Sequence, residues 1–226
     1  MAGRKVYAVK RGRTTGTYGS WEECRASVEG YPGAEYKSFS TEEEAMAYLG
    51  LGGREEDGEE LPRPGCLLAY VDGSYDHSLR KYAFGCVFLL PDGRIYLQYG
   101  NGDKESGLQQ RNVTGEMLGA MYAARTAMVN GFAAIEIRYD YQGIEKWVTG
   151  EWRARNGLTQ EYARVMREWG KSMKMTFTKV EAHANVTYNE LADRTAKRGL
   201  TQGSGVPKPC RLEEMEEYRG DEDADQ

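Results

Sequence analysis

The residues whose places in the sequence suggest chemistry are four carboxylates: Asp72, Glu116, Asp140 and Asp193. Two follow apolar runs that predict strands, Glu116 falls in the first turn of a predicted helix, and Asp193 lies in the last helix. Strand ends and helix starts on one edge of a sheet can converge, and converging carboxylates repel one another unless cations neutralise them. Hard cations such as Mg²⁺ prefer oxygen ligands. The pattern therefore suggests a site for two metal ions, which can activate water and stabilise the leaving oxygen of a phosphodiester. Taken singly, each acid is more typical of a turn or a solvated helix.

The elements that would position these acids follow from the hydrophobic pattern of residues 66–202. Three strands come first, with Pro91, Asp92 and Gly93 as the turn between the second and third. A helix over 114–130 carries methionine and alanine on one face. The predicted strands are 67–71, 82–90, 94–99, 134–139 and 175–180, and the later helices lie near 143–149, 159–171 and 189–198. This order predicts an α/β fold with a mixed five-stranded sheet and helices on both faces.

A second, smaller unit is predicted at residues 1–50. Strands at 6–9 and 35–39 alternate with a helix that Ser20 should cap and with another at 42–49, which gives a β-α-β-α order. Residues 51–65 are rich in Gly, Pro, Glu and Arg and are expected to form a flexible acidic linker. The acidic stretch 203–226 is expected to be a disordered tail.

Charge and composition leave a nucleic-acid partner open. The net charge of the 226 residues is −5, but the acids gather in the linker and the tail, whereas basic residues outnumber acids in residues 66–210. Apolar runs stay well below the ~18 residues of a membrane span, so no membrane association is expected. The four cysteines, Cys24, Cys66, Cys86 and Cys210, are scattered, which favours neither a zinc site nor a disulfide framework and suggests the cytoplasm.

Four motifs in residues 66–200 together resemble bacterial type 1 ribonuclease H. They are Tyr-Val-Asp-Gly-Ser, Asn-Val-Thr-Gly-Glu, Tyr-Asp-Tyr-Gln-Gly-Ile-Glu-Lys-Trp and Glu-Ala-His-Ala-x5-Asn-Glu-Leu-Ala-Asp. The resemblance implies that the four carboxylates bind two Mg²⁺ ions, for which Mn²⁺ can substitute. It also implies a monomeric endoribonuclease that cuts the RNA strand of RNA/DNA hybrids and leaves 3′-OH and 5′-phosphate ends.

The same resemblance assigns further residues. His183, ten residues before Asp193, matches the family's flexible-loop histidine, and the resemblance implies a role in proton transfer or product release. A histidine titrates near neutrality, which suits that role. Asn112 and Asn189 match hybrid-contacting positions, although either could simply cap a helix.

Other positions lie beside these motifs. Gly73 and Ser74 could offer backbone groups to an RNA 2′-OH. Arg111 stands where some relatives have threonine. His77 has no comparable context and is expected at the surface.

Residues 5–49 resemble the hybrid-binding domain that precedes many ribonuclease H domains and is related to viroplasmin. The matching segments begin at Tyr7, Trp21 and Tyr36. The resemblance implies that Trp21 and Tyr36 pack against the DNA strand while Tyr7 and Lys37 also contact the hybrid. Aromatic side chains beside cations suit nucleic-acid contact. The alternative is that Trp21 and Tyr36, and equally Tyr7, belong to a core.

Two other functions compete with the enzyme. One is a hybrid-binding protein whose nuclease domain is silent, which the complete set of four carboxylates disfavours. The other is a different nuclease of the same fold, such as a junction resolvase or an integrase. The N-terminal module and the Asn-Val-Thr-Gly-Glu motif disfavour this second alternative.

Overall fold

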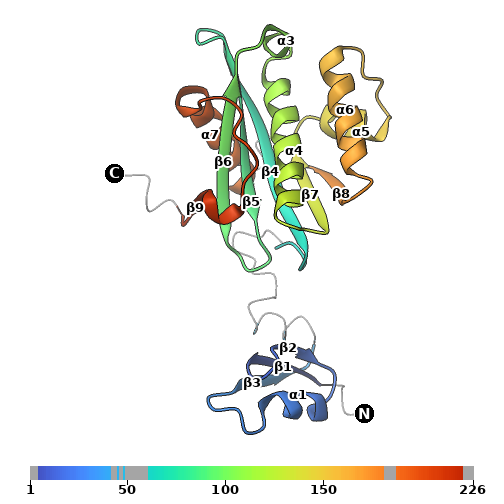
Figure 1. Cartoon of the computed structure of the whole chain (residues 1–226), viewed down its shortest axis with the longest axis vertical. Coiled ribbons are helices and arrows are strands. Elements are labelled where there is room, and N and C mark those ends of the chain that lie inside the picture. The colour runs from blue at the N-terminus through green and yellow to red at the C-terminus, as the bar shows by residue number, and fades with distance from the viewer. Residues whose placement is uncertain (1–4, 42–44, 46–47, 49–60, 181–186, 221–226) are drawn as a thin grey trace. The chain divides into compact units, whose positions relative to one another are not determined.

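A computed structural model describes residues 5–41, 45, 48, 61–180 and 187–220 (Figure 1). The chain divides into two compact units. The smaller contains residues 1–64 and 91–93, and the larger contains residues 65–90 and 94–226. Each unit has its own hydrophobic core. No helix among the described residues is long and apolar enough to cross a membrane.

The smaller unit is built on a three-stranded antiparallel sheet in the order β2-β1-β3, against which the helix of residues 21–28 packs. Its elements are β1 (Val6–Arg11), β2 (Gly16–Tyr18), α1 (Trp21–Val28) and β3 (Glu35–Phe39). Ser20 caps α1 as predicted, because its hydroxyl accepts a hydrogen bond from the Glu23 N–H at 3.3 Å. The short strand β2 was not predicted. The helix expected at 42–49 lies largely outside the described residues.

The larger unit contains a mixed six-stranded sheet in the order β8-β7-β4-β5-β6-β9. Strands β4 (Cys66–Asp76), β5 (Lys81–Leu89) and β6 (Ile95–Gly102) form an antiparallel meander. Strands β7 (Ala134–Tyr139) and β8 (Lys174–Lys179) run parallel to β4. The α/β class and the mixed sheet agree with the prediction, but the number of strands does not.

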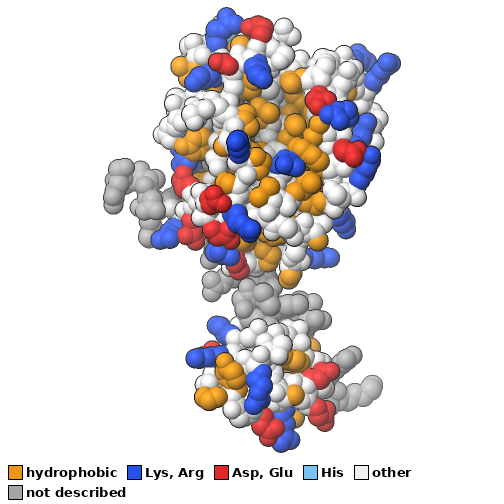
Figure 2. Space-filling view, in the orientation of Figure 1, with side chains coloured by type: hydrophobic (Ala, Val, Ile, Leu, Met, Phe, Trp, Pro, Cys, Tyr) orange, Lys and Arg blue, Asp and Glu red, His pale blue; other side chains and the backbone are white. Residues whose placement is uncertain are grey.

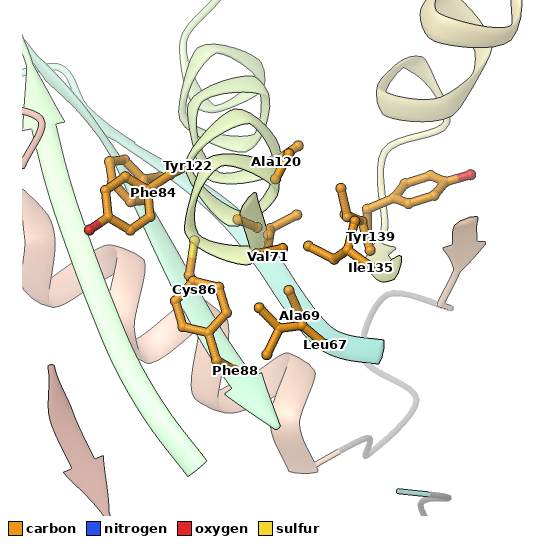
Figure 3. Packing of buried hydrophobic residues seen from close by; sticks show 14 of the residues in the cluster. Leu67, Ala69, Val71, Phe84, Cys86, Phe88, Ala120, Tyr122, Ile135 and Tyr139 are labelled. Atoms are coloured by element: carbon orange, nitrogen blue, oxygen red, sulfur yellow. The ribbon is translucent and has the colours of Figure 1, made fainter. Parts of the chain in front are cut away.

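Helices cover both faces of this sheet, as predicted. One face carries α4 (Asn112–Val129), with α5 (Gly143–Thr149) and α6 (Gly157–Trp169) beside it, and the other carries α7 (Thr187–Gln202) (Figure 1). A four-residue helix, α3 (Glu105–Leu108), precedes α4. Alternate residues of the strands, including Val71, Phe84 and Ile135, pack under the alanine-rich side of α4 (Figure 3). Small side chains on this helix let it approach the sheet closely.

The prediction of a disordered tail was wrong for residues 203–220, because this segment contains the sixth strand of the sheet. A 3₁₀ turn, η1 (Leu212–Glu214), is followed by β9 (Glu216–Tyr218), which pairs antiparallel with β6. Leu212 and Met215 are buried in the core. The buried Asn101 side chain donates to the carbonyls of Gly199 and Gly203 and accepts from the Gly205 N–H. Two apolar anchors and buried hydrogen bonds thus fix a segment whose overall charge suggested disorder.

Candidate active site

Two glycines bring the strand that carries Asp72 against the helix that carries Glu116. A Cβ on Gly73 would lie 2.1 Å from the Asn112 carbonyl oxygen, and a Cβ on Gly115 would lie 2.0 Å from the Ala83 carbonyl oxygen. Neither position has room for a side chain, so β4 and α4 pack backbone against backbone. Glu116 is the fifth residue of α4 because the helix begins at Asn112, earlier than predicted. The close approach carries Glu116 to the edge of the sheet where Asp72 lies.

The parallel pairing of β4 and β7 places Asp72 beside Asp140. Their last paired residues are Tyr70 and Arg138, so Asp72 and Asp140 each lie two residues further, where β7 has ended. Asp72 was expected at a strand end, but β4 continues through it to Asp76 because β5 remains paired there. Space for other carboxylates beside Asp72 therefore arises because β7 ends there, although β4 itself continues.

Three of the four predicted carboxylates meet. Oxygen atoms of Asp72, Glu116 and Asp140 all lie within 4.8 Å of one another. Glu116 is only 1% exposed, and its Oε2 atom is buried without a hydrogen-bond partner. A buried, unsatisfied carboxylate oxygen beside two other acids is unfavourable unless a cation completes the group. The donor set, all carboxylate oxygens, is the one that Mg²⁺ prefers, so these residues fit a metal centre.

The acidity of the cluster reflects the same crowding. Burial, followed by the charge of Asp140, raises the pKa of Asp72 to about 7, although the Gly73 N–H donates to its Oδ1 atom at 2.6 Å and opposes this. Burial, followed by the charges of Asp140 and Asp72, raises the pKa of Glu116 to about 9, although the backbone N–H of Tyr141 opposes this. These shifts show that the site disfavours the negative charges it must carry.

Asp193 lies near this group but outside it. The carboxylate is on α7, and its Oδ2 atom accepts from the Lys197 ammonium, one turn later, at 2.7 Å. The negative charge of Asp193 raises the pKa of Asp72, and the positive charge of Lys197 lowers it. Lys197 lies on the exposed face of α7, where its ammonium pairs with the carboxylate that was predicted to bind metal. The spacing of four residues on a helix was the available signal.

The remaining predicted residues of the larger unit lie on β4, α4 and α7, except His183, which lies outside the described residues. Ser74 continues β4, and Asn112 is exposed at the first position of α4, whose N-cap is Arg111. Asn189 is buried within α7. Neither asparagine occupies the N-cap position that the alternative required of it.

A group of aromatic rings adjoins Asp140, and two of its members, Tyr141 and Trp147, belong to the Tyr-Asp-Tyr-Gln-Gly-Ile-Glu-Lys-Trp motif. Tyr141 contacts Trp147 and Trp152, with ring centroids 5.7 and 6.3 Å apart, and Trp152 is 38% exposed. The Lys146 ammonium lies 5.4 Å from the Trp152 ring centroid. Trp147 and Trp152 follow Asp140 by seven and twelve residues, and this closeness in the sequence was the signal that could have identified the group.

Comparison with known proteins identifies this constellation. The model of the RNase H family matches residues 65–201, which is more than half of the chain. The chain belongs to the RNase H family. A second family, described as the ribonuclease H1 N-terminal domain, matches residues 5–49 of the smaller unit.

Individual proteins that are similar to this chain agree with the family match. Ribonuclease H1 of Mus musculus is 27% identical over 87% of this chain and 89% of its own length, and that of Homo sapiens is 26% identical over 87% and 89%. The crystal structure of RNase H1 from the halophilic archaeon Halobacterium salinarum NRC-1 covers 60% of this chain and 97% of its own, with 26% identity and a TM-score of 0.50. The matched part of that structure is the size of the RNase H domain.

The domain that precedes the RNase H domain presents a row of aromatic rings. Trp21 lies between Tyr7 and Tyr36, at centroid distances of 5.6 and 5.7 Å. Trp21 and Tyr36 are 41% and 46% exposed, so the alternative that they form a core is excluded. Tyr7 is half-buried and packs partly against the core.

Lys37 does not join this row. Neighbouring residues of a strand point to opposite faces, and the Lys37 ammonium lies 5.5 Å from the ring centroid of Phe39, away from Tyr36. The structure therefore brings together three of the four predicted contacts of the smaller unit.

Proposed function

We propose that this enzyme hydrolyses the RNA strand of RNA/DNA hybrids at the carboxylate cluster, with two divalent metal ions. The observation that carries the proposal is the meeting of Asp72, Glu116 and Asp140 within 4.8 Å in an RNase H domain. The ribonuclease H1 relatives support the hybrid as substrate.

The cluster would hold the ions through carboxylate oxygens. Asp72, Glu116 and Asp140 would supply three of the ligands, and Asp193, whose carboxylate pairs with Lys197 in the absence of metal, would supply the fourth. When bound, the ions supply an activated water and stabilise the leaving oxygen. Mg²⁺ suits this all-oxygen set, and Mn²⁺ accepts the same ligands.

The chain's own side chains contribute binding and proton handling. His183 would donate a proton to the 3′-oxygen that departs when the P–O3′ bond breaks, so that the cut leaves 3′-OH and 5′-phosphate ends. The backbone at Gly73 and Ser74, with Asn112 and Asn189, would contact the hybrid on either side of the cut. Contacts to the 2′-OH distinguish RNA from DNA.

The two aromatic surfaces extend this binding. Trp152, beside Asp140, and the Tyr7, Trp21 and Tyr36 row of the smaller unit would stack on sugars and bases, because such stacking is tolerant of sequence. Lys37 would contact a phosphate from the edge strand β3. We further propose that the enzyme acts as a cytoplasmic monomer.

Carboxylate variants test the proposal. Asp72→Asn, Asp140→Asn and Asp193→Asn should each lower the cleavage rate more than 100-fold, because a neutral amide holds Mg²⁺ poorly, while hybrid affinity measured in EDTA stays within about threefold. The exposed Glu213→Gln serves as the control, since Glu213 lies far along the chain in the turn before β9. Near-normal turnover of Asp72→Asn at saturating Mg²⁺ would contradict the assignment of the site, whereas a wild-type protein that binds the hybrid without cutting it would be better described as a silent, hybrid-binding protein.

A further inference from the structure

A largely buried charge, that of Arg138 on β7, lies two residues before Asp140. Figure 2 shows Lys, Arg, Asp and Glu side chains spread over the surface of the larger unit, where charged groups normally lie. Arg138 differs from them, because its side chain is only 18% exposed. A guanidinium that is largely removed from water needs hydrogen-bond partners. The partners of Arg138 therefore indicate which elements it holds together.

Arg138 connects β7 to β4 through its side chain. Its Nε atom donates to Oε1 of Glu136 at 2.9 Å, and its Nη1 atom donates to the hydroxyl of Tyr70 on β4. The guanidinium carbon also lies 5.2 Å from the Tyr70 ring centroid. Tyr70 and Arg138 are direct partners in the parallel register, at the last paired position of β4 and β7. The two strands are thus joined by side chains as well as by backbone hydrogen bonds where their pairing ends.

Tyr70 extends this connection to α7. Ala69 and Val71 pack under α4 (Figure 3), so Tyr70, which alternates with them along β4, faces the other side of the sheet. There its fully buried ring lies 5.8 Å from the ring of Tyr188, in the first turn of α7. Tyr188 is itself buried, and aromatic pairs at such distances attract one another beyond the area they bury. The single ring of Tyr70 therefore contacts both β7 and α7.

Each of these three residues precedes one of the predicted metal ligands on its own segment of the chain. The two strand residues come two positions before an aspartate, which is about 7 Å along a strand. The helix residue comes five positions before an aspartate, or about one and a half turns. The pairs are Tyr70 and Asp72, Arg138 and Asp140, and Tyr188 and Asp193. The three side chains thus connect the three segments that carry the aspartates.

The aspartates repel one another, and this repulsion favours separation of the segments that carry them. Resting on the function proposed above, we infer that Tyr70, with its partners Arg138 and Tyr188, is a positioning residue of the metal site. It fixes the spacing of the three aspartates against their repulsion, so that they can share metal ions. Side chains that orient metal ligands without touching the metal typically contribute 10- to 100-fold to metal affinity or activity, on the order of the ligands' own environment.

Tyr70→Phe in the full chain tests this inference, because it removes the hydroxyl that Arg138 holds and keeps the buried ring. Without substrate, it should weaken the binding of Mn²⁺, followed by electron paramagnetic resonance, by about tenfold. The Mg²⁺ concentration for half-maximal cleavage should rise by about the same factor, while KM for a short hybrid stays within about twofold. Saturating Mg²⁺ should restore most of kcat, since the metal then holds its ligands together.

Tyr96→Phe is the matched control. The Arg94 Nη1 atom donates to the Tyr96 hydroxyl at 3.1 Å, and the Arg94 guanidinium lies 6.0 Å from the ring centroid. Tyr96 is also buried, but it lies on β6, two strands from β4 in the sheet. Tyr96→Phe should lower the unfolding midpoint by a similar amount and leave Mn²⁺ affinity unchanged. Wild-type Mn²⁺ affinity in Tyr70→Phe, or equal losses in the two variants, would overturn the inference.

Variants of the two partners test whether the three side chains act together. Arg138→Met removes the same hydrogen bond, so its effect on Mn²⁺ affinity and that of Tyr70→Phe should not add in the double variant. Tyr188→Leu should also weaken Mn²⁺ binding, and Tyr188→Phe, which keeps the ring, should recover most of the loss. Fully additive losses would contradict a shared role. A wild type that binds Mn²⁺ but does not cut the hybrid would refute the proposed function, and the Mn²⁺ affinities would still decide this inference.

Discussion

At the scale of single residues, the chemistry depends on acids placed where their charges are unfavourable. Burial and mutual repulsion raise the pKa of Asp72 to about 7 and that of Glu116 to about 9. The positive charge of Lys197, which pairs with Asp193, opposes the rise in the pKa of Asp72. The four acids could be selected from sequence because each has a distinctive neighbourhood. Their mutual distances could not, because these depend on the β4–β7 register and on two glycine contacts.

The raised pKa values predict how the metal-free enzyme responds to pH. A carboxyl whose pKa is higher in the folded than in the unfolded chain contributes stability below the unfolded value, near 4, that is lost as pH rises through the folded value. In EDTA, the unfolding midpoint should therefore fall as the pH rises from about 5 to 9. Glu116→Gln removes the buried charge, so its midpoint should exceed that of the wild type at pH 9, by thermal denaturation.

The control for this prediction is Glu213→Gln, which alters an exposed acid and should follow the wild type. Saturating Mg²⁺ should raise the wild-type midpoint more at pH 8 than at pH 6, since metal binding displaces protons from the cluster. A wild-type midpoint that stays level to pH 9 in EDTA would show that the acids are not strained by their burial.

At the scale of elements, backbone contacts decide the site. Gly115 lets α4 touch β4 and β5. Gly119, one turn later, faces more open space, because a Cβ added there would lie 3.3 Å from the Val71 Cβ atom. Gly115→Ala should push the helix away from the sheet, lower activity more than tenfold and reduce the unfolding midpoint. Gly119→Ala should change activity less than about threefold, since helix propensity offsets a small adjustment.

These two variants differ by one turn of the same helix, so general effects of alanine are matched. The comparison combines initial rates on a short hybrid with thermal unfolding. Equal losses in the two variants would indicate that the closeness of α4 to β4 does not set the position of Glu116.

The strongly periodic elements were predictable and the short ones were not. Strand β7 and helix α5 have the predicted bounds, and Ser20 caps α1. Strands β2 and β9 contain three residues each and depend on pairing with a neighbour rather than on their own pattern. For β9, the acidic residues concealed the anchors Leu212 and Met215. The exposure of the aromatic row could not be predicted from the sequence, because aromatic residues at the spacings of Tyr7, Trp21 and Tyr36 suit a core equally well.

At the scale of the whole molecule, two units suggest a division of labour. The four carboxylates belong to the larger unit, and the aromatic row belongs to the smaller. Because both are parts of one chain, binding by one raises the effective concentration of the other on a long hybrid. Deletion of residues 1–50 should leave kcat on a short hybrid within about twofold, but weaken hybrid binding and reduce the number of cuts per encounter on a long one.

Trp21→Ala with Tyr36→Ala should reproduce the deletion, because stacking is worth on the order of 1–3 kcal/mol per contact. Binding measured in EDTA and product distributions at limiting enzyme would report the two effects. Lys10→Gln is a suitable control, since Lys10 lies over the Tyr48 ring rather than in the aromatic row. Unchanged processivity of the truncated enzyme would remove the smaller unit from substrate handling.

The most direct test of the central claim compares end-labelled RNA/DNA, RNA/RNA and DNA/DNA duplexes of one sequence, with Mg²⁺ and with EDTA. Only the RNA strand of the hybrid should be cut, only with the metal, with 5′-phosphate and 3′-OH ends, and Asp72→Asn should abolish the cut. Cleavage of the hybrid in EDTA, or equal cleavage of DNA/DNA, would contradict a metal-dependent ribonuclease H centred on Asp72, Glu116, Asp140 and Asp193.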